Sequence, residues 1–417
     1  MSGVAPGSAP GDTRGPGDTR GAGDEGGDGD CASDAASARA DVPFLIGLAS
    51  LDQVGPSRLA ALLGQRSPAE AWENVCRGVH VAATRTEGAT GITADLAAAW
   101  RTQAAGIDLD ELARAHTDAG VAVLRPQHPC FHGAFDHDPS PPHVLFARGR
   151  LEPLSGPKVA IVGTRNCTRY GRDLAEAFGR ELSEAGVAVV SGLALGIDGA
   201  AHRGALAALA VPPIGVVGSG LDVVYPRSHR QLWSEVADYG VLLGEYPLGL
   251  RPAPWRFPAR NRIIAALADL TLVVESRIAG GSMLTVDESV ARNKDVLAVP
   301  GSVHSAASAG TNKLLFDGCG MVRDTADILL RLGQLPQVAS VIKKAKAARI
   351  EAKRPKGDAA AVLEAIGWEP ASTEQILVRT SLPVSTLATV LDQLTDGGWI
   401  ANNGGWYEQI GKPGARR

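Results

Sequence analysis

The feature that most constrains the fold of this chain is a regular alternation of short apolar runs and amphipathic stretches between Lys158 and Val322. Amphipathic stretches such as Gly171–Ala185 and Asp198–Ala210 separate most of the runs. Strands that alternate with helices pair in parallel and carry helices on both faces of their sheet. The sequence therefore predicts an α/β domain with a mostly parallel sheet over residues 156–332. The runs expected to form its strands are Val159–Val162, Val187–Val190, Ile214–Val217, Val241–Leu243, Leu270–Val274, Val296–Val299 and Met321–Val322.

The segments before this domain have a different composition. Residues 1–40 are rich in Gly, Asp, Ala and Ser, and such a segment buries too little apolar surface to offset its ordering entropy. We expect a disordered acidic tail there; an acidic interaction tail is the alternative. Residues 121–155 are expected to be a short extended connector, because His128-Pro129 and the run Pro139–Pro142 break regular structure.

Residues 41–120 are expected to form a small N-terminal helical module. Within it, Leu45–Leu63 has the pattern of a helix, a Gly-Pro turn and a second helix. The turn Val54–Ser57 fits a helix-hairpin-helix (SAM-like) module, whose second helix can hold a phosphate at its N-terminus. It fits an ordinary helical turn equally well, and the sequence leaves both interpretations open.

The C-terminal part of the chain is expected to be a separate small domain. Residues 333–357 form a basic linker, and residues 358–410 have the order of a winged helix, with helices near 359–366, 372–380 and 384–395 followed by two short strands. Acidic residues outnumber basic ones over 358–410, and Val384–Thr395 contains no Lys or Arg. This disfavours duplex binding and favours a protein-contact or regulatory role. Residues 411–417 are expected to be a tail.

The charge distribution matters more than the net charge of −4 over 417 residues. The acidic surplus lies in the N-terminal tail and the winged helix, so the predicted α/β domain is not acidic overall. The five cysteines are scattered singly, which predicts neither a zinc site nor a disulfide framework. Neither a signal-peptide layout nor a long apolar span is evident, so we expect a cytoplasmic protein.

The predicted strands end in loops that are rich in Gly and small polar residues. Ligands of open parallel sheets bind beyond these carboxyl ends, where glycines and helix N-termini suit an anion. The loop after the first strand is not GxGxxG, the second strand ends in Ser191 rather than an acid, and neither a P-loop nor a GxSxG motif occurs. We therefore expect a phosphate-bearing ligand other than a dinucleotide or a hydrolysed nucleotide, and no cofactor.

An arginine-rich segment suits a polynucleotide. Between Tyr225 and Arg262 six arginines face three acids, and Phe257 lies among the last of them. Guanidinium groups pair with phosphates, and an aromatic face stacks a base of any sequence. The alternative is that Phe257 is a core residue and the arginines cap a helix.

Six motifs in chain order resemble the DprA (DNA-processing) family. Each motif alone is weak, but their order between Val159 and Asn312 is specific, and a helical N-terminal module and a C-terminal winged helix also occur in many members. The motifs are Val159–Arg165, Ser191–Asp198 with His202, Gly220-Leu221-Asp222 with Tyr225-Pro226, Phe257–Ile264, Gly281–Thr285, and Ala298–Gly301 with Gly310-Thr311-Asn312.

The resemblance implies a Rossmann-like domain that binds single-stranded DNA without sequence preference, self-associates as a homodimer and loads the RecA recombinase on the strand. It implies protection of incoming DNA in natural transformation or recombination, with no catalytic turnover and no metal. Three departures weaken individual roles: Thr164 where Ser is usual, His229 where Asn is common, and Asp287-Glu288 where small or apolar residues are frequent. Carried over residue by residue, the expected DNA-binding residues are Gly163, Thr164, Arg165, Ser191, Gly192, Phe257, Arg260, Asn261, Arg262, Gly281 and Ser282.

Two other functions remain as alternatives. The first is a nucleotide-processing hydrolase that uses Glu245 or Glu275, as in Rossmann-like phosphoribohydrolases. It is disfavoured because Met283, Leu284 and Asp287 stand where that motif needs Gly, Thr and Glu. The second is a regulatory protein that works through its winged helix. Asp198 and His202, four residues apart on one helix face, are expected to be structural rather than catalytic.

Overall fold

The computed structural model describes residues 40–79, 91–131, 133–333, 355–367, 370–397 and 399–409. The chain divides into two compact units, Met1–Arg323 and Asp324–Arg417. The expectations for residues 1–39, for most of the basic linker and for the C-terminal tail lie outside the described residues. No helix in the described ranges is long and apolar enough to cross a membrane.

A nine-stranded sheet forms the centre of the first unit, in the order β1-β2-β6-β5-β4-β3-β7-β8-β9. The strands from β6 to β9 in this order pair in parallel, whereas β1 and β2 add antiparallel at one edge. The parallel strands begin and end within about one residue of the predicted apolar runs, because the runs from β3 to β8 are mostly buried between the two helical layers, whereas the edge strand β9 is exposed. They are β3 (Lys158–Val162), β4 (Ala188–Ser191), β5 (Ile214–Val216), β6 (Val241–Gly244), β7 (Leu270–Val273), β8 (Asp295–Ala298) and β9 (Gly320–Met321).

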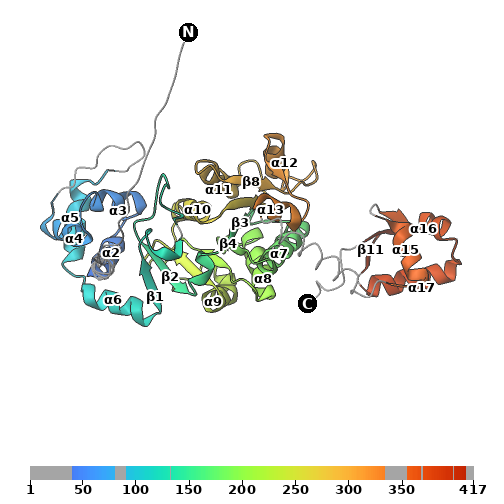
Figure 1. Cartoon of the computed structure of the whole chain (residues 1–417), viewed down its shortest axis with the longest axis horizontal. Coiled ribbons are helices and arrows are strands. Elements are labelled where there is room, and N and C mark those ends of the chain that lie inside the picture. The colour runs from blue at the N-terminus through green and yellow to red at the C-terminus, as the bar shows by residue number, and fades with distance from the viewer. Residues whose placement is uncertain are drawn as a thin grey trace, which may run out of the picture. The chain divides into compact units, whose positions relative to one another are not determined.

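Helices cover both faces of the sheet, which confirms the predicted α/β class (Figure 1). One face carries α7 (Arg169–Glu184), α8 (Ile197–Ala208) and α9 (Arg230–Tyr239). The other carries α10 (Arg256–Leu267) and α11 (Gly281–Val290), and α12 (Ala309–Phe316) lies between β8 and β9 in the chain. Buried residues of α10 such as Ile263 and Ile264 pack with the strands in one continuous core.

The segment expected to be a connector contains two strands of the sheet. β1 (Val121–Leu124) and β2 (Leu145–Gly149) form an antiparallel pair, and β2 continues the sheet beside β6. Short 3-10 helices η1 (Pro129–Phe131) and η2 (Glu152–Leu154) flank β2. β2 becomes a strand because β6 offers an open edge, a long-range pairing that the local prolines do not reveal.

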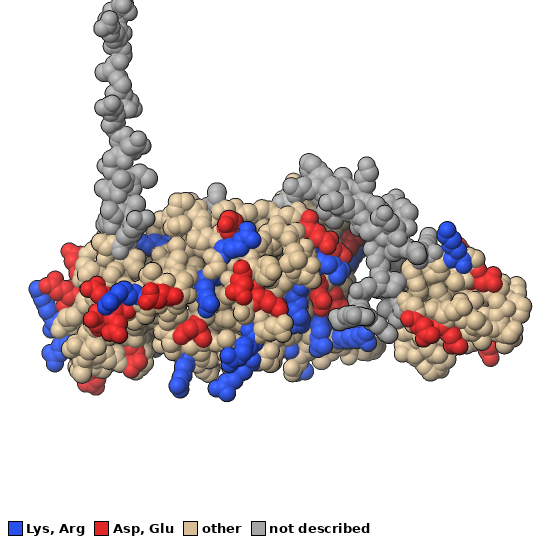
Figure 2. Space-filling model, turned by 90° about the horizontal axis from the view of Figure 1, so that it is seen from below, with Lys and Arg blue, Asp and Glu red and all other residues tan. Residues whose placement is uncertain are grey.

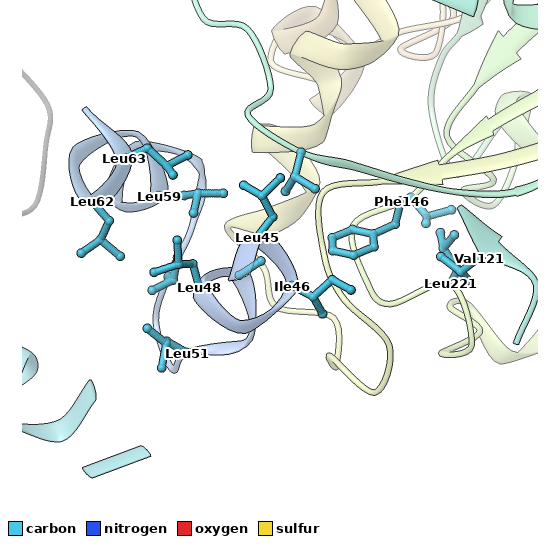
Figure 3. Packing of buried hydrophobic residues seen from close by; sticks show 14 of the residues in the cluster. Leu45, Ile46, Leu48, Leu51, Leu59, Leu62, Leu63, Val121, Phe146 and Leu221 are labelled. Atoms are coloured by element: carbon cyan, nitrogen blue, oxygen red, sulfur yellow. The ribbon is translucent and has the colours of Figure 1, made fainter. Parts of the chain in front are cut away.

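The N-terminal helical module packs against this edge of the sheet. Its helices are α2 (Val42–Ser50), α3 (Pro56–Leu63), α4 (Pro68–Arg77), α5 (Ala94–Ala104) and α6 (Leu109–Asp118). Leucines of α2 and α3 share one buried cluster with Val121 of β1, Phe146 of β2 and Leu221 (Figure 3). His116 of α6 adds a polar link, because its Nε2 accepts from the backbone N–H of Leu248, 3.1 Å away. The module and the sheet therefore form one packed body.

The second unit contains the winged helix that the sequence predicts. After α13 (Thr325–Arg331) come α15 (Asp358–Ile366), β10 (Ala371–Ser372), α16 (Thr373–Thr380), α17 (Val384–Asp396), β11 (Ile400–Asn403) and β12 (Trp406–Gln409). Three short strands pair in the order β10-β12-β11. Its own core holds Val362, Ile376, Leu387 and Leu391.

Candidate nucleic-acid interface

The strand order places the candidate site at the carboxyl ends of the parallel strands. The chain runs from β3 outward to β6 and then returns to β7 on the other side of β3, so the order reverses between β3 and β7. In doubly wound folds this reversal opens a crevice where ligands bind. The loops after β3, β4, β5 and β6 lie at the same end of the sheet and meet the N-terminus of α10.

The crevice at the reversal is filled by the chain itself. Glu275, which follows β7 and is 2% exposed, accepts hydrogen bonds from the backbone N–H of Thr168 at 2.8 Å and from its hydroxyl at 2.6 Å. Thr168 is the N-cap of α7, and a Cβ on Gly171 in the first turn would overlap the Glu275 carboxylate. A carboxylate therefore occupies the place where a dinucleotide phosphate would meet this helix.

A guanidinium and two aromatic rings gather beside the crevice. The Arg165 guanidinium carbon lies 5.5 Å from the centroid of the Phe257 ring, and the Tyr225 ring lies 5.1 Å from the Phe257 ring at 34°. Arg165 is exposed, Phe257 is half-buried and Tyr225 is 43% exposed. We call these three side chains the aromatic–arginine cluster. They come from the loop after β3, the first turn of α10 and the loop after β5.

Arg260 lies beneath this cluster as a buried support. Its guanidinium donates to the Gly192 carbonyl at 2.7 Å and to the Val216 carbonyl, while its Nε donates to Asn261 Oδ1 at 3.1 Å. Burial lowers the pKa of Arg260 to about 10, although Asp198 opposes the shift. Arg260 therefore joins the ends of β4 and β5 and holds a positive charge below the surface.

The remaining residues predicted in the strand-end loops have packing roles. The Thr164 N–H donates to the Glu275 carbonyl at 2.7 Å, and the buried Ser191 hydroxyl donates to the Ile161 carbonyl at 2.6 Å. Gly163 is half-buried, and a Cβ there would overlap Ile197. Gly192 has no room for a Cβ because the Arg260 guanidinium lies against it. These residues shape the floor of the site and present backbone rather than side chains.

Three predicted residues are not brought to the cluster. Arg262 is buried in an ion pair with Glu245 and donates to the Ser140 carbonyl at 2.7 Å, so it holds the segment before β2. Gly281 is exposed and Ser282 is buried at the start of α11, where the Ser282 hydroxyl donates to Ser276 Oγ at 2.8 Å. The structure shows no contact between these three residues and the aromatic–arginine cluster.

The carboxylates considered for catalysis are committed to internal contacts, and His202 is completely buried. Burial raises the pKa of Asp198, which accepts from the Gly192 N–H at 3.2 Å. Burial lowers the pKa of His202 to about 3. Burial also raises the pKa of Glu245, against the attraction of Arg262. Within the described ranges, no three His, Cys, Asp or Glu side chains are grouped to hold a metal.

The surface charge of the first unit is uneven (Figure 2). On the face shown, Lys and Arg side chains project along the lower margin of the first unit, while basic and acidic side chains are mixed nearer its centre and over the N-terminal helices. A solvent groove of about 300 Å³ lies at the opposite, amino end of the strands, beside Lys158, Asp269 and Lys294. Both lysines bond to backbone carbonyls there. Because the groove lies at the other end of the strands, it is separate from the aromatic–arginine cluster.

Tyr225 is a site residue that was not predicted from the sequence. Tyr225-Pro226 belongs to one of the six motifs, and the position of an aromatic residue within an arginine-rich strand-end loop was a usable signal for a base-stacking role. His229, in the same loop, lies against the strand-end backbone, because its Nδ1 is 3.1 Å from the Leu193 carbonyl. A structural role therefore accounts for His229.

Comparisons with known proteins agree on one family. Residues 122–333 match the family model of DNA recombination-mediator protein A, and residues 345–395 match the DprA winged helix domain. A putative DNA processing protein DprA of Mycobacterium tuberculosis is 43% identical over 48% of this chain and 51% of its own length. Protein Smf of Escherichia coli is 33% identical over 64% of this chain and 72% of its own length.

A solved structure supports the same likeness. The crystal structure of DNA processing protein A from Streptococcus pneumoniae superposes with a TM-score of 0.56 at 28% identity, covering 69% of this chain and 95% of the other. The chain spans about half the length of the first curated relatives that it matches.

Proposed function

This chain belongs to the DNA recombination-mediator protein A family, and from that premise we propose that it binds single-stranded DNA without sequence preference at the carboxyl-end loops of its sheet. The aromatic–arginine cluster carries the proposal. An exposed guanidinium over an aromatic face offers a phosphate partner and a base platform in one place, and neither selects a base.

The residues below the cluster keep it in position. Arg260 links the ends of β4 and β5, and Asn261 Oδ1 accepts from its Nε. Gly163, Thr164, Ser191 and Gly192 supply the packed backbone beneath Arg165 and Phe257. Gly281 and Ser282, at the start of α11, are proposed as a more distant phosphate contact. For Arg262, we propose structural support through Glu245 in place of direct DNA contact.

The wider role follows from the family. We propose that this cytoplasmic protein protects single-stranded DNA and loads the RecA recombinase on it during recombination or natural transformation. The role needs no catalytic turnover and no cofactor. The buried ion pair of Glu245 and the helix-capping contacts of Glu275 support this view, because neither carboxylate is presented to a substrate.

Self-association as a homodimer is part of the same proposal. Phe316 at the end of α12 is 91% exposed, Met321 on the edge strand β9 is 54% exposed, and Val303 is 85% exposed. Large apolar side chains beside an open strand edge favour pairing with a second copy of the chain. Sedimentation analysis should give the mass of a dimer for wild type and the mass of a monomer for Phe316→Glu. The same mass for both proteins would refute this dimer surface.

The test of the DNA site is a salt titration of single-strand and duplex affinity by fluorescence anisotropy. Arg165→Ala should weaken single-strand binding and lower the slope of log K against log salt by about 0.7, the share of one phosphate contact. Arg148→Ala is the matched control, because Arg148 is exposed on β2 opposite Leu242, near the amino end of β6. Unchanged affinity and slope in Arg165→Ala would remove the cluster from the binding site.

A further inference from the structure

A second aromatic platform lies on the other side of the α10 N-terminus. Trp255, the N-cap residue of α10, is 46% exposed, which is high for so large an apolar side chain. The Arg256 guanidinium carbon lies 5.1 Å from its ring centroid, and the Tyr246 ring meets it edge-on at 6.2 Å and 83°. One side of the indole is held by protein and the rest is open to solvent.

The N-terminal module holds the same ring in place. A Cβ added to Gly55, in the turn between α2 and α3, would lie 2.9 Å from the outer edge of the Trp255 ring. The turn therefore needs glycine in order to lie against the indole. Because protein contacts fix the orientation of the ring, little rotamer entropy remains to be lost when a base stacks on it.

The backbone between the two platforms is continuous and tied together. The Gly220 N–H donates to the Leu250 carbonyl at 2.9 Å, and the Asp222 carboxylate accepts from the Gly249 N–H at 2.9 and 3.0 Å. These bonds join the loop that carries Tyr225 to the loop that leads into Trp255. Trp255 and Phe257 then stand two residues apart at the start of one helix.

The charges around Trp255 favour a polyanion. Arg251 is exposed in the loop before it, and its carbonyl accepts from Arg256. The two acids of the adjoining loops are engaged, Glu245 with Arg262 and Asp222 with the Gly249 N–H. An approaching phosphate therefore meets the exposed Arg251 guanidinium, with the buried charge of Arg256 beneath the ring, while these carboxylates already have partners.

We propose that Trp255 is a second base-stacking position, and that the strand passes from the aromatic–arginine cluster over the N-terminus of α10 to Trp255, beside the Gly55 turn. This inference rests on the proposed single-strand binding and extends it, because it gives the N-terminal module a part in shaping the binding path. The structural alternative is that Trp255 serves only to dock that module.

The test compares oligothymidylates of increasing length on the full chain. Trp255→Ala should weaken binding of long oligomers on the order of 10-fold and leave the shortest bound oligomer nearly unchanged, because only a longer strand reaches the second position. Phe257→Ala should weaken binding at every length. Trp406→Ala is the matched control, since Trp406 is a 49% exposed tryptophan of the winged helix.

Indole fluorescence gives a second readout that does not depend on losing the docking contact. Trp255→Phe keeps an aromatic ring, so it should retain most of the affinity while losing the DNA-induced quenching that wild type and Trp406→Phe show. If wild type binds no single strand, the proposed function itself fails. If wild type binds and Phe257→Ala weakens it, but Trp255→Ala shows wild-type length dependence and Trp255→Phe keeps the quenching, the second position is overturned.

Discussion

At the scale of single residues, the direction in which a side chain leaves α10 determines whether a residue of the Phe257–Ile264 motif reaches the candidate DNA site. Arg260 and Arg262 are two positions apart on α10, and successive helical residues turn by about 100°, so the two side chains leave the helix in widely different directions. Phe257 and Arg260, three apart, share a face and reach the strand-end loops. Arg262 instead reaches Glu245 and Ser140.

This geometry predicts what Arg262 does when it is replaced. Arg262→Ala leaves the buried Glu245 carboxylate without its partner, and the free energy of unfolding should fall by about 3–5 kcal/mol. The single-strand affinity of the protein that remains folded should stay near wild type. Urea unfolding and anisotropy measure the two effects, and the double variant Glu245→Leu/Arg262→Met should regain part of the stability. A stable Arg262→Ala variant with weak DNA binding would instead mean that Arg262 contacts DNA directly.

His202 predicts a pH dependence of stability. Its pKa is about 3 in the folded protein because burial disfavours the charged ring, whereas an unfolded histidine titrates near 6.5. Between these pH values the unfolded chain binds the extra proton, so the free energy of unfolding falls as pH falls, by up to about 1.4 kcal/mol per pH unit. In urea titrations at pH 7, 6, 5 and 4, His202→Leu should reduce the slope of the free energy of unfolding against pH by the amount that corresponds to about one proton. His116 and His143, whose pKa values burial also lowers, act equally in both proteins.

At the scale of elements, the parallel strands β3 to β8 were predictable because each is a short, mostly buried apolar run. Residue type and order along the chain also led to Arg165 and Phe257, which the fold brings together. β2 was not predictable, because it depends on β6, a partner strand about 100 residues later in the chain, and β1 in turn pairs only with β2. Tyr225 joins the cluster only through the fold of the loop after β5, which no local pattern shows.

Glu275, which follows β7, occupies the N-terminus of α7, where doubly wound folds often bind a phosphate. Its carboxylate takes both the N–H and the hydroxyl of Thr168 at the start of α7. Glu275→Gln removes the charge beside the helix dipole and weakens the capping bonds, so the free energy of unfolding should fall by about 1–2 kcal/mol. Thr168→Ser, which keeps the hydroxyl, should cost less than Thr168→Val in the same urea titration. Equal stability of Glu275→Gln and wild type would contradict this capping role.

At the scale of the whole molecule, the net charge conceals a difference between an acidic winged helix and the arginines at the candidate DNA site. The described winged helix carries acids on α15, α16 and α17 and the single arginine Arg379, whose guanidinium bonds to the Ala365 carbonyl. Phosphate neutralisation supplies most of the nonspecific affinity for nucleic acid, so such a domain adds little to it. The candidate DNA site belongs entirely to the first unit.

Two truncations test whether single-stranded DNA binding requires only the first unit. A chain that ends at residue 357 lacks the winged helix but keeps the basic linker, and a chain that ends at residue 333 lacks both. Because the aromatic–arginine cluster and its supports lie before residue 324, both chains should bind single-stranded DNA within about threefold of the full chain. Anisotropy against salt concentration separates the remaining contributions. A loss only in the shorter chain, with a reduced salt slope, would assign phosphate contacts to the linker lysines and arginines. A loss of more than about tenfold in both chains would mean that the winged helix itself holds DNA, and its acidic surface would then need another explanation.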